Sequence, residues 1–191
     1  MNITSAKFIK GIVDADEILD DGIPQVAFIG RSNVGKSSVI NTLANKKDLA
    51  KTSSFPGRTR EINIFLINNS FYLVDLPGYG FAKGSKQEQE KIQSLIYWYL
   101  LDSRYRQKKV VLIIDAELGA TNNDLQMLYS LKERGKDVVV VANKVDKIKK
   151  SSYKKQLADI QSALGDYKII PYSAKKKIGV NELANEIFLL N

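Results

Sequence analysis

The stretch GRSNVGKS at positions 30–37 fits the pattern G-x-x-x-x-G-K-[ST] in full. It follows residues 26–29, an apolar run typical of a buried strand, and precedes residues 38–47, which have a helical pattern. In this setting the glycines let the backbone curl until successive N–H groups point at phosphate oxygens, and the positive end of the helix dipole favours the same anion. A plain turn rich in glycine and serine is the alternative, and the correct flanks and the motifs downstream favour a phosphate-binding loop.

Two side chains of this loop have specific expected roles. Lys36 supplies a positive charge to the β- and γ-phosphates of a nucleotide, and the Ser37 hydroxyl is an expected Mg²⁺ ligand. The loop residues that we expect to contact the nucleotide are Gly30, Arg31, Ser32, Asn33, Val34, Gly35, Lys36, Ser37 and Ser38.

A second motif, NKVD at 143–146, indicates which base is bound. It follows residues 138–141, a run of valines typical of a strand buried on both faces of a parallel sheet, and open α/β sheets hold ligands at such strand ends. The Asp146 carboxylate accepts two hydrogen bonds side by side, which matches the N1–H and 2-amino donors of guanine and conflicts with the N1 lone pair of adenine. We expect Asn143 to serve the guanine edge or the surrounding loops, and the Lys144 stem to lie over the base.

Two further motifs complete the set. DLPG at 75–78 follows an apolar strand, so Asp75 can reach Mg²⁺ through its water shell, and the Gly78 N–H can bond the γ-phosphate. YSA at 172–174 follows another short strand, where a backbone N–H can reach guanine O6. The nucleotide-contacting residues expected from the three downstream motifs are Asp75, Leu76, Pro77, Gly78, Asn143, Lys144, Asp146, Tyr172, Ser173 and Ala174.

These four motifs, in this order and spacing, resemble the translation-factor branch of small P-loop GTPases. The segments GRSNVGKSS at 30–38, TSSFPGRTREIN at 52–63 and DLPGYGFAK at 75–83 resemble the bacterial EngB family, also called YsxC or YihA. The resemblance covers nearly the whole chain and implies GTP or GDP as ligand, with Mg²⁺. It also implies that Thr59 is a second Mg²⁺ ligand. The remaining nucleotide contacts of that segment would be Gly57, Arg58 and Arg60, and the catalytic set would be Lys36, Thr59, Asp75 and Gly78.

The resemblance and the alternation of strand and helix patterns predict a three-layer α/β domain of the Ras-like P-loop GTPase class. We expect a mostly parallel six-stranded sheet with one antiparallel edge strand and helices on both faces. One GTP-binding domain should span residues 1–191, with residues 1–24 an N-terminal arm packed on it. The expected strands are 25–30, 62–66, 71–75, 110–115, 137–142 and 168–172, and the expected helices are 36–46, 89–103, 121–134, 151–164 and 178–190.

Composition narrows the chemistry. A chain of 191 residues is long enough to bury a stable hydrophobic core without disulfides or a structural metal. It contains neither cysteine nor histidine. Thiolate chemistry, a histidine base and a histidine metal ligand are therefore excluded. The first residues lack the pattern of a signal peptide, and the apolar runs are far shorter than a membrane span, so we expect a cytoplasmic protein.

The aromatic end of the helix expected at 89–103 allows two interpretations. Tyr99 falls on the apolar face with Ile92 and Ile96, which favours packing against the sheet. Tyr97 and Trp98 lie partly off that face, where they would suit a partner contact or a base-stacking platform. We favour plain packing for the cluster.

Charge indicates the class of partner. The formal net charge is +8, and residues 144–155 hold six lysines against the single carboxylate Asp146. Lys175, Lys176 and Lys177 follow the other base-side loop, and Arg104, Arg106, Lys108 and Lys109 form another cluster. A solvated lysine-rich surface is the plain alternative, but clustering in a nucleotide switch favours an RNA-sized polyanion. The family resemblance implies the large (50S) ribosomal subunit during its assembly, with no DNA partner and a monomeric chain.

Hydrolysis should be slow in the free protein. Many related GTPases place glutamine directly after the glycine of the D-x-x-G motif to orient water, and here that position is Tyr79. Arg58 and Arg60 are candidates for an internal arginine finger or for partner contacts. Asn33 is a candidate K⁺ ligand at the phosphates, with a simple turn-capping role as its alternative.

Two other functional classes remain. A metabolic P-loop kinase would have no use for the NKVD and YSA motifs. A guanine-nucleotide module for cell division, septation or the membrane surface would use the same basic residues on anionic lipid.

Overall fold

The computed structural model describes residues 3–51, 61–80, 85–102 and 105–188. Within these residues seven strands form one sheet in the order β1-β3-β4-β2-β5-β6-β7. The strands are β1 (Ala6–Ile12), β2 (Gln25–Gly30), β3 (Ile62–Ile67), β4 (Phe71–Asp75), β5 (Gln107–Asp115), β6 (Val138–Asn143) and β7 (Ile169–Pro171). The helices are α1 (Lys36–Leu43), α2 (Lys86–Tyr97), α3 (Asn122–Glu133), α4 (Tyr153–Leu164) and α5 (Val180–Phe188).

The centre of the sheet is parallel and buried on both faces. β2 pairs in parallel with β4 and β5, and every residue of β2 and β6 is buried. The β-branched and aromatic side chains of these strands suit a sheet covered by helices on each face. The predicted α/β fold with a mostly parallel sheet is confirmed.

The prediction of six strands with one antiparallel edge strand was wrong in number. The predicted hairpin forms from β3 and β4, but the N-terminal arm adds β1, which pairs antiparallel with β3 from Ala6 opposite Ile67 to Ile12 opposite Ile62. The register shifts between Phe8 and Lys10, so the side-chain alternation that identifies a strand is interrupted. β1 leaves most of its side chains exposed, as an edge strand carrying lysines does.

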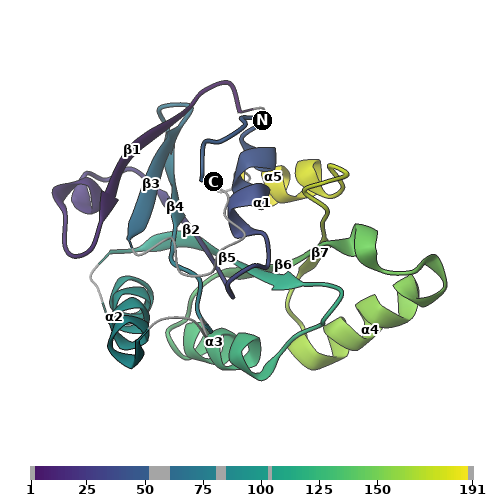
Figure 1. The fold of residues 1–191 in the computed structure, drawn as a ribbon. Coiled ribbons are helices and arrows are strands. Elements are labelled where there is room, and N and C mark those ends of the chain that lie inside the picture. Colours follow the sequence, from purple (N-terminus) through teal and green to yellow (C-terminus); the bar gives the residue numbers. More distant parts are fainter. Residues whose placement is uncertain (1–2, 52–60, 81–84, 103–104, 189–191) are drawn as a thin grey trace.

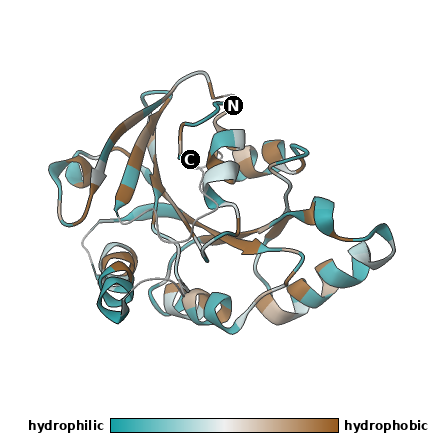
Figure 2. Ribbon diagram, in the orientation of Figure 1, coloured by the Kyte–Doolittle hydropathy of each residue, from teal (hydrophilic) through white to brown (hydrophobic). Residues whose placement is uncertain are grey.

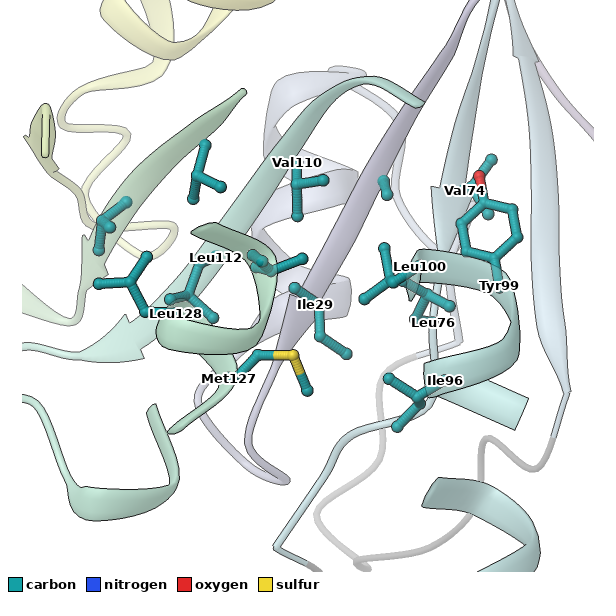
Figure 3. Close-up of a cluster of buried hydrophobic side chains, with 14 of the residues drawn as sticks. Ile29, Val74, Leu76, Ile96, Tyr99, Leu100, Val110, Leu112, Met127 and Leu128 are labelled. Carbon is teal, nitrogen blue, oxygen red and sulfur yellow. The ribbon is translucent and has the colours of Figure 1, made fainter. Parts of the chain in front are cut away.

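Helices cover both faces of the sheet (Figure 1). α1 and α5 pack on one face in a core that includes Phe28, Val39 and Leu183. α2, α3 and α4 pack on the other face, and brown apolar residues alternate with teal hydrophilic ones along these helices in Figure 2. Figure 3 shows this second core, where Ile29 of β2 lies among side chains of α2 and α3 such as Ile96 and Met127.

The helix expected at 89–103 has different bounds. A capping box between Ser85 and Glu88 starts α2 at Lys86, and the helix passes at Trp98 into a π-helical turn, η2 (Trp98–Asp102). Tyr99 is fully buried, and its hydroxyl donates to Gln25 Oε1 at 2.7 Å, so its predicted packing role is confirmed. Trp98 stays partly buried and lies edge-on to Tyr105, with ring centroids 5.9 Å apart.

Candidate functional site

The predicted motifs converge at the carboxyl edge of the sheet. Strand register places Asp75 of β4 beside Phe28 of β2, and Asn143 of β6 beside Asp115 of β5. The loops that follow β2, β4, β5 and β6 therefore open on the same side, where parallel α/β sheets bind ligands.

The phosphate loop, residues 30–37, is fixed by its neighbours. Gly35 has φ +92° and immediately precedes α1. The backbone N–H groups of the loop and the N-terminus of the helix therefore face the same space. The Asn143 amide donates to the Val34 carbonyl at 2.8 Å. A Cβ on Gly35 would come within 2.5 Å of that amide nitrogen, so glycine is required here for both conformation and space.

Lys36 and Asp75 form a buried ion pair at the centre of the site. Their exposed fractions are 8% and 2%. Burial raises the pKa of Asp75, and the adjacent Lys36 charge opposes that rise. The pair unites the two motifs predicted to handle phosphate and metal.

The DLPG loop is hydrogen-bonded directly to the phosphate loop through the backbone. The Ser32 N–H donates to the Tyr79 carbonyl at 3.0 Å, and the Tyr79 N–H donates to the Gly30 carbonyl at 3.3 Å. A Cβ on Gly78 would lie 2.9 Å from the Ser32 nitrogen. Gly78 therefore lies against the loop that cradles phosphates, as its predicted role requires.

Asp124 of α3 is a site residue that sequence reasoning missed. It is fully buried, and it receives the Tyr79 hydroxyl at 2.7 Å and Arg31 Nε at 3.1 and 3.3 Å. Thr121 also donates to it through its N–H and its hydroxyl, at 2.9 and 2.7 Å. Burial together with the Asp124 charge raises the pKa of Tyr79 far above its ordinary value, so this phenol stays protonated. Asp124 thus ties the phosphate loop, the DLPG loop and α3 together.

A cavity of about 520 Å³ lies on the base side of the phosphate loop. Its lining residues are Gly35, Ser38, Asn41, Thr42, Lys47, Asp48, Asn143, Lys144, Asp146, Lys147, Ala174 and Lys175. The volume suits a nucleoside, and the two base-side motifs, NKVD and YSA, both contribute to its wall.

The NKVD side chains divide their tasks. Lys144 Nζ donates to Asp115 Oδ2 and to the Asn33 carbonyl, both at 2.6 Å, so it bridges two loops. Asn143 Oδ1 accepts from the Ala174 N–H at 3.3 Å, and its amide holds Val34, so it serves the surrounding loops. Asp146 is exposed.

Ser173 orients the Asp146 carboxylate. Its fully buried hydroxyl donates to Asp146 Oδ1 at 2.5 Å and accepts from the Lys176 N–H at 3.0 Å. Only one carboxylate oxygen is engaged by Ser173, so Asp146 keeps acceptor capacity for a base in the cavity.

Several predicted contacts can reach a nucleotide only through their backbone. The side chains of Val34, Leu76 and Tyr172 are buried in the two cores. Tyr172 instead holds the base-side loop by its main chain, donating to the Ala142 carbonyl at 2.8 Å and accepting from the Val145 N–H at 3.1 Å. The predicted contacts Gly57, Arg58, Thr59 and Arg60 lie outside the described residues.

The donor set fits a Mg²⁺ ion. Ser37 lies in the first turn of α1 directly after Lys36, and Asp75 offers a carboxylate from the end of the adjacent strand β4. Hydroxyl and carboxylate oxygens are hard donors of the kind Mg²⁺ takes beside phosphates and water. Within the described part of the chain no cluster of three or more acidic, histidine or cysteine residues forms a separate metal cage.

Comparison with known proteins shows the family to which this chain belongs. Residues 25–144 match the family described as 50S ribosome-binding GTPase, and residues 105–190 match the elongation factor Tu GTP binding domain. The probable GTP-binding protein EngB of Clostridium perfringens (strain SM101 / Type A) is 47% identical over 98% of this chain and 96% of its own length. The probable EngB of Clostridioides difficile (strain 630) is 44% identical over 98% and 93%.

Solved structures show the same architecture. The crystal structure of a probable GTP-binding protein engB has 29% identity and a TM-score of 0.72, covering 87% of this chain and 97% of its own. Era in complex with MgGDPNP and nucleotides 1506–1542 of 16S ribosomal RNA has 27% identity and a TM-score of 0.70, covering 86% and 55%. With the family match over residues 25–144, which include the phosphate loop, and the likeness to named relatives over 98% of its length, the chain belongs to the EngB family of P-loop GTPases.

Proposed function

We propose that this GTPase is a slow GTP-dependent switch in the assembly of the large (50S) ribosomal subunit. The observation that carries the proposal is a surface of exposed lysines directly beside the guanine-side cavity. We call it the basic patch, and it consists of Lys147, Lys149, Lys150, Lys154, Lys155, Lys175, Lys176 and Lys177. The description of the matching family as 50S ribosome-binding supports this choice of particle, and Era bound to ribosomal RNA supports RNA as the ligand class.

The position of the basic patch suits a switch. Lys147 and Lys175 line the same cavity as Asp146, so a change in the base-side loops would move charges that face a polyanion. In the described part of the chain the basic patch has one carboxylate partner, Glu117, which lies 3.5 Å from Lys147. Its other lysines therefore keep their charge available for phosphates.

In the predicted cluster of Arg104, Arg106, Lys108 and Lys109, Arg106 and Lys108 are exposed, but Lys109 does not add to the basic surface. Lys109 is only 6% exposed, and it pairs with Glu186 at 2.6 Å and Asp137 at 3.0 Å. These hydrogen bonds and charges raise its pKa although burial alone would lower it. Lys109 is therefore a structural cation and is not part of the surface that we propose for RNA contact.

The chemistry expected at the phosphates rests on positioning and charge. Lys36 and the N-terminus of α1 stabilise negative charge on the phosphoryl group, and Gly78 offers an N–H beside the phosphate loop. When bound, Mg²⁺ would be held by Ser37 and, through water, by Asp75, and it would neutralise phosphate charge. Thr59 is proposed as its further ligand.

The Tyr79 hydroxyl donates its proton to Asp124, so that proton is not free to orient an attacking water. We infer that intrinsic hydrolysis is slow and is completed by the ribosomal particle or by K⁺. A cytoplasmic, monomeric protein is part of the same proposal. No helix in the described residues is long and apolar enough to cross a membrane.

Sedimentation of purified large subunits with the protein tests the proposal. GTP should favour co-sedimentation over GDP, and Lys149→Glu, Lys150→Glu and Lys154→Glu together should abolish it while GTP binding stays intact. The matched control reverses three exposed lysines elsewhere, Lys7, Lys86 and Lys132, and should retain binding. Each phosphate contact removed should reduce the slope of log affinity against log salt by about 0.7–0.9.

Equal subunit binding in the patch variant and the control would overturn the RNA assignment. The same experiment with a cell lysate distinguishes the alternative of a cell-division, septation or membrane-surface module. Recovery with membranes in place of large subunits would favour that alternative.

A further inference from the structure

α2 and the turn after β1 enclose a groove that the nucleotide site does not use. Its volume is about 870 Å³, and its walls come from residues 13–15 and from α2 with its continuation at Trp98. In Figure 1 this end of the molecule, with β1 and α2, lies opposite the end formed by α4, where part of the basic patch lies. A volume of this size is in the range of specific ligand pockets.

The floor of the groove is apolar. Ile92 and Leu95 of α2 belong to the core but still line the groove, and Trp98 lies partly buried beside them. Val13 on the opposite wall is 64% exposed, which is high for an aliphatic side chain beside other apolar groups. The floor and wall therefore offer a place for an aliphatic anchor.

The rim of the groove is acidic. Asp14, Glu88 and Glu90 line it, and among the described residues that line the groove Lys91 is the one cation. Glu90 also lies 4.0 Å from the exposed Lys86 of its own helix, and Glu88 closes the capping box with Ser85. The acidic run continues along the chain, because residues 14–21 contain Asp14, Asp16, Glu17, Asp20 and Asp21 and no lysine or arginine. In a chain of net charge +8, this segment concentrates the opposite sign at one end. Its field repels RNA and anionic lipid and attracts cations.

We propose that this groove docks a lysine- or arginine-rich segment of a partner protein, with an aliphatic side chain on the floor and basic side chains on the rim. Apolar burial would supply affinity, and the acidic rim would select the sign of the partner. The proposal extends the proposed function, because proteins that contact RNA carry excess basic residues. It assigns the two ends of this GTPase to two ligands, RNA at the basic patch and protein at the groove.

Trp98 provides a direct readout, since it lines the groove and is the only tryptophan in the chain. The probe is a short synthetic peptide of alternating lysine and leucine, titrated into the whole protein while tryptophan emission is followed. Saturable change in Trp98 emission is expected. Two matched peptides serve as controls: one of lysine and serine, which lacks the apolar anchor, and one of glutamate and leucine, which has the wrong charge. Each should bind at least about tenfold more weakly than the lysine–leucine peptide.

Charge reversal at the rim is the matched genetic test. The variant with Asp14→Lys and Glu90→Lys should bind the lysine–leucine peptide with an affinity lower by about tenfold or more. Glu133→Lys with Asp166→Lys makes the same change in net charge at exposed residues outside the groove, and it should leave affinity unchanged. GTP binding should be equal in all three proteins, which also shows that each variant folds.

Four results would overturn the proposal: no response of Trp98, equal binding of all three peptides, equal weakening in the control variant, or an emission change that depends on protein concentration alone. The last would make a second copy of this chain the occupant. Because this titration contains no ribosomal particle, its failure is separate from failure of the subunit-binding experiment.

Discussion

Replacing Asp124 with Asn tests the link between the phosphate loop and the DLPG loop. Asparagine keeps the size of the side chain but replaces one acceptor oxygen with a donor and removes the charge. Arg31 Nε and the Thr121 N–H both donate to the carboxylate and neither can become an acceptor. Whichever way the amide turns, Arg31 loses its ion pair.

The magnitude follows from burial. Asp124 is fully buried and the Arg31 side chain is 19% exposed, so a largely desolvated guanidinium would be left without its counter-ion. Breaking such a pair costs about 3–5 kcal/mol, and the residual exposure of Arg31 favours the lower end, about 3 kcal/mol. For a chain of this size that is a fall in Tm of roughly 6–12 °C.

Urea denaturation of four proteins measures the effect: wild type, Asp124→Asn, Tyr79→Phe and the double variant. Tyr79→Phe removes one hydrogen bond and should cost about 1–2 kcal/mol on its own. The double variant should be more stable than the sum of the single effects implies, because both changes act on one network. Tyr79→Phe should also leave the rate of GTP hydrolysis unchanged, since this hydroxyl is bonded to Asp124.

The reasoning fails if Asp124→Asn loses less than about 1 kcal/mol or if the two effects are additive. A large fall in hydrolysis in Tyr79→Phe, with stability nearly preserved, would place the hydroxyl at the reacting water instead.

Three other outcomes follow from single side chains. GTP turnover should be faster in KCl than in NaCl at matched ionic strength, and Asn33→Ala should remove the difference; Asn33 is exposed, and its side chain has no hydrogen-bond partner among the described residues. Burial alone would raise the pKa of Glu186, but ion pairs with Lys109 and Lys168 lower it below the ordinary 4.5. The stability that these pairs provide is present above pH 4.5 and is lost as pH falls through the lowered pKa, so denaturation of Glu186→Gln and wild type should differ at pH 7 and converge in acid. Tyr172→Phe should be neutral or stabilising by about 1 kcal/mol in thermal unfolding, because the buried Tyr172 hydroxyl has no partner in the described part of the chain.

The parallel centre of the sheet could be predicted because each of its strands has a recognisable local sequence pattern. Residues of β6 such as Val139 and Val140 are buried on both faces, which requires a continuous apolar run. β1 gave no such signal. Only Ala6 and Ile12 of that strand are buried, and the register shift at Phe8 breaks the alternation that remains.

The site likewise contains residues that could be predicted from the sequence and one, Asp124, that could not. The phosphate loop and NKVD are contiguous motifs whose geometry follows from a strand, a turn and a helix, and their residues meet as expected. Asp124 carries a local signal only as the acidic member of a capping box with Thr121. Its partner Arg31 is 93 residues away, so their contact depends on the packing of α3 beside β2 and could not be read from spacing.

The most direct test of the account is the base specificity of Asp146. Asp146→Asn keeps an oxygen for the Ser173 hydroxyl but turns a donor toward the 2-amino group of guanine. GTP affinity should fall by about 2–5 kcal/mol, as for the loss of a charged hydrogen bond that becomes buried when the base binds over Asp146. Xanthosine triphosphate, whose 2-oxo group accepts that donor, should gain affinity in the variant. Direct nucleotide titration of both proteins should show this exchange of preference, whereas equal GTP affinity in wild type and Asp146→Asn, with no gain for xanthosine triphosphate, would contradict the assignment of this cavity to guanine.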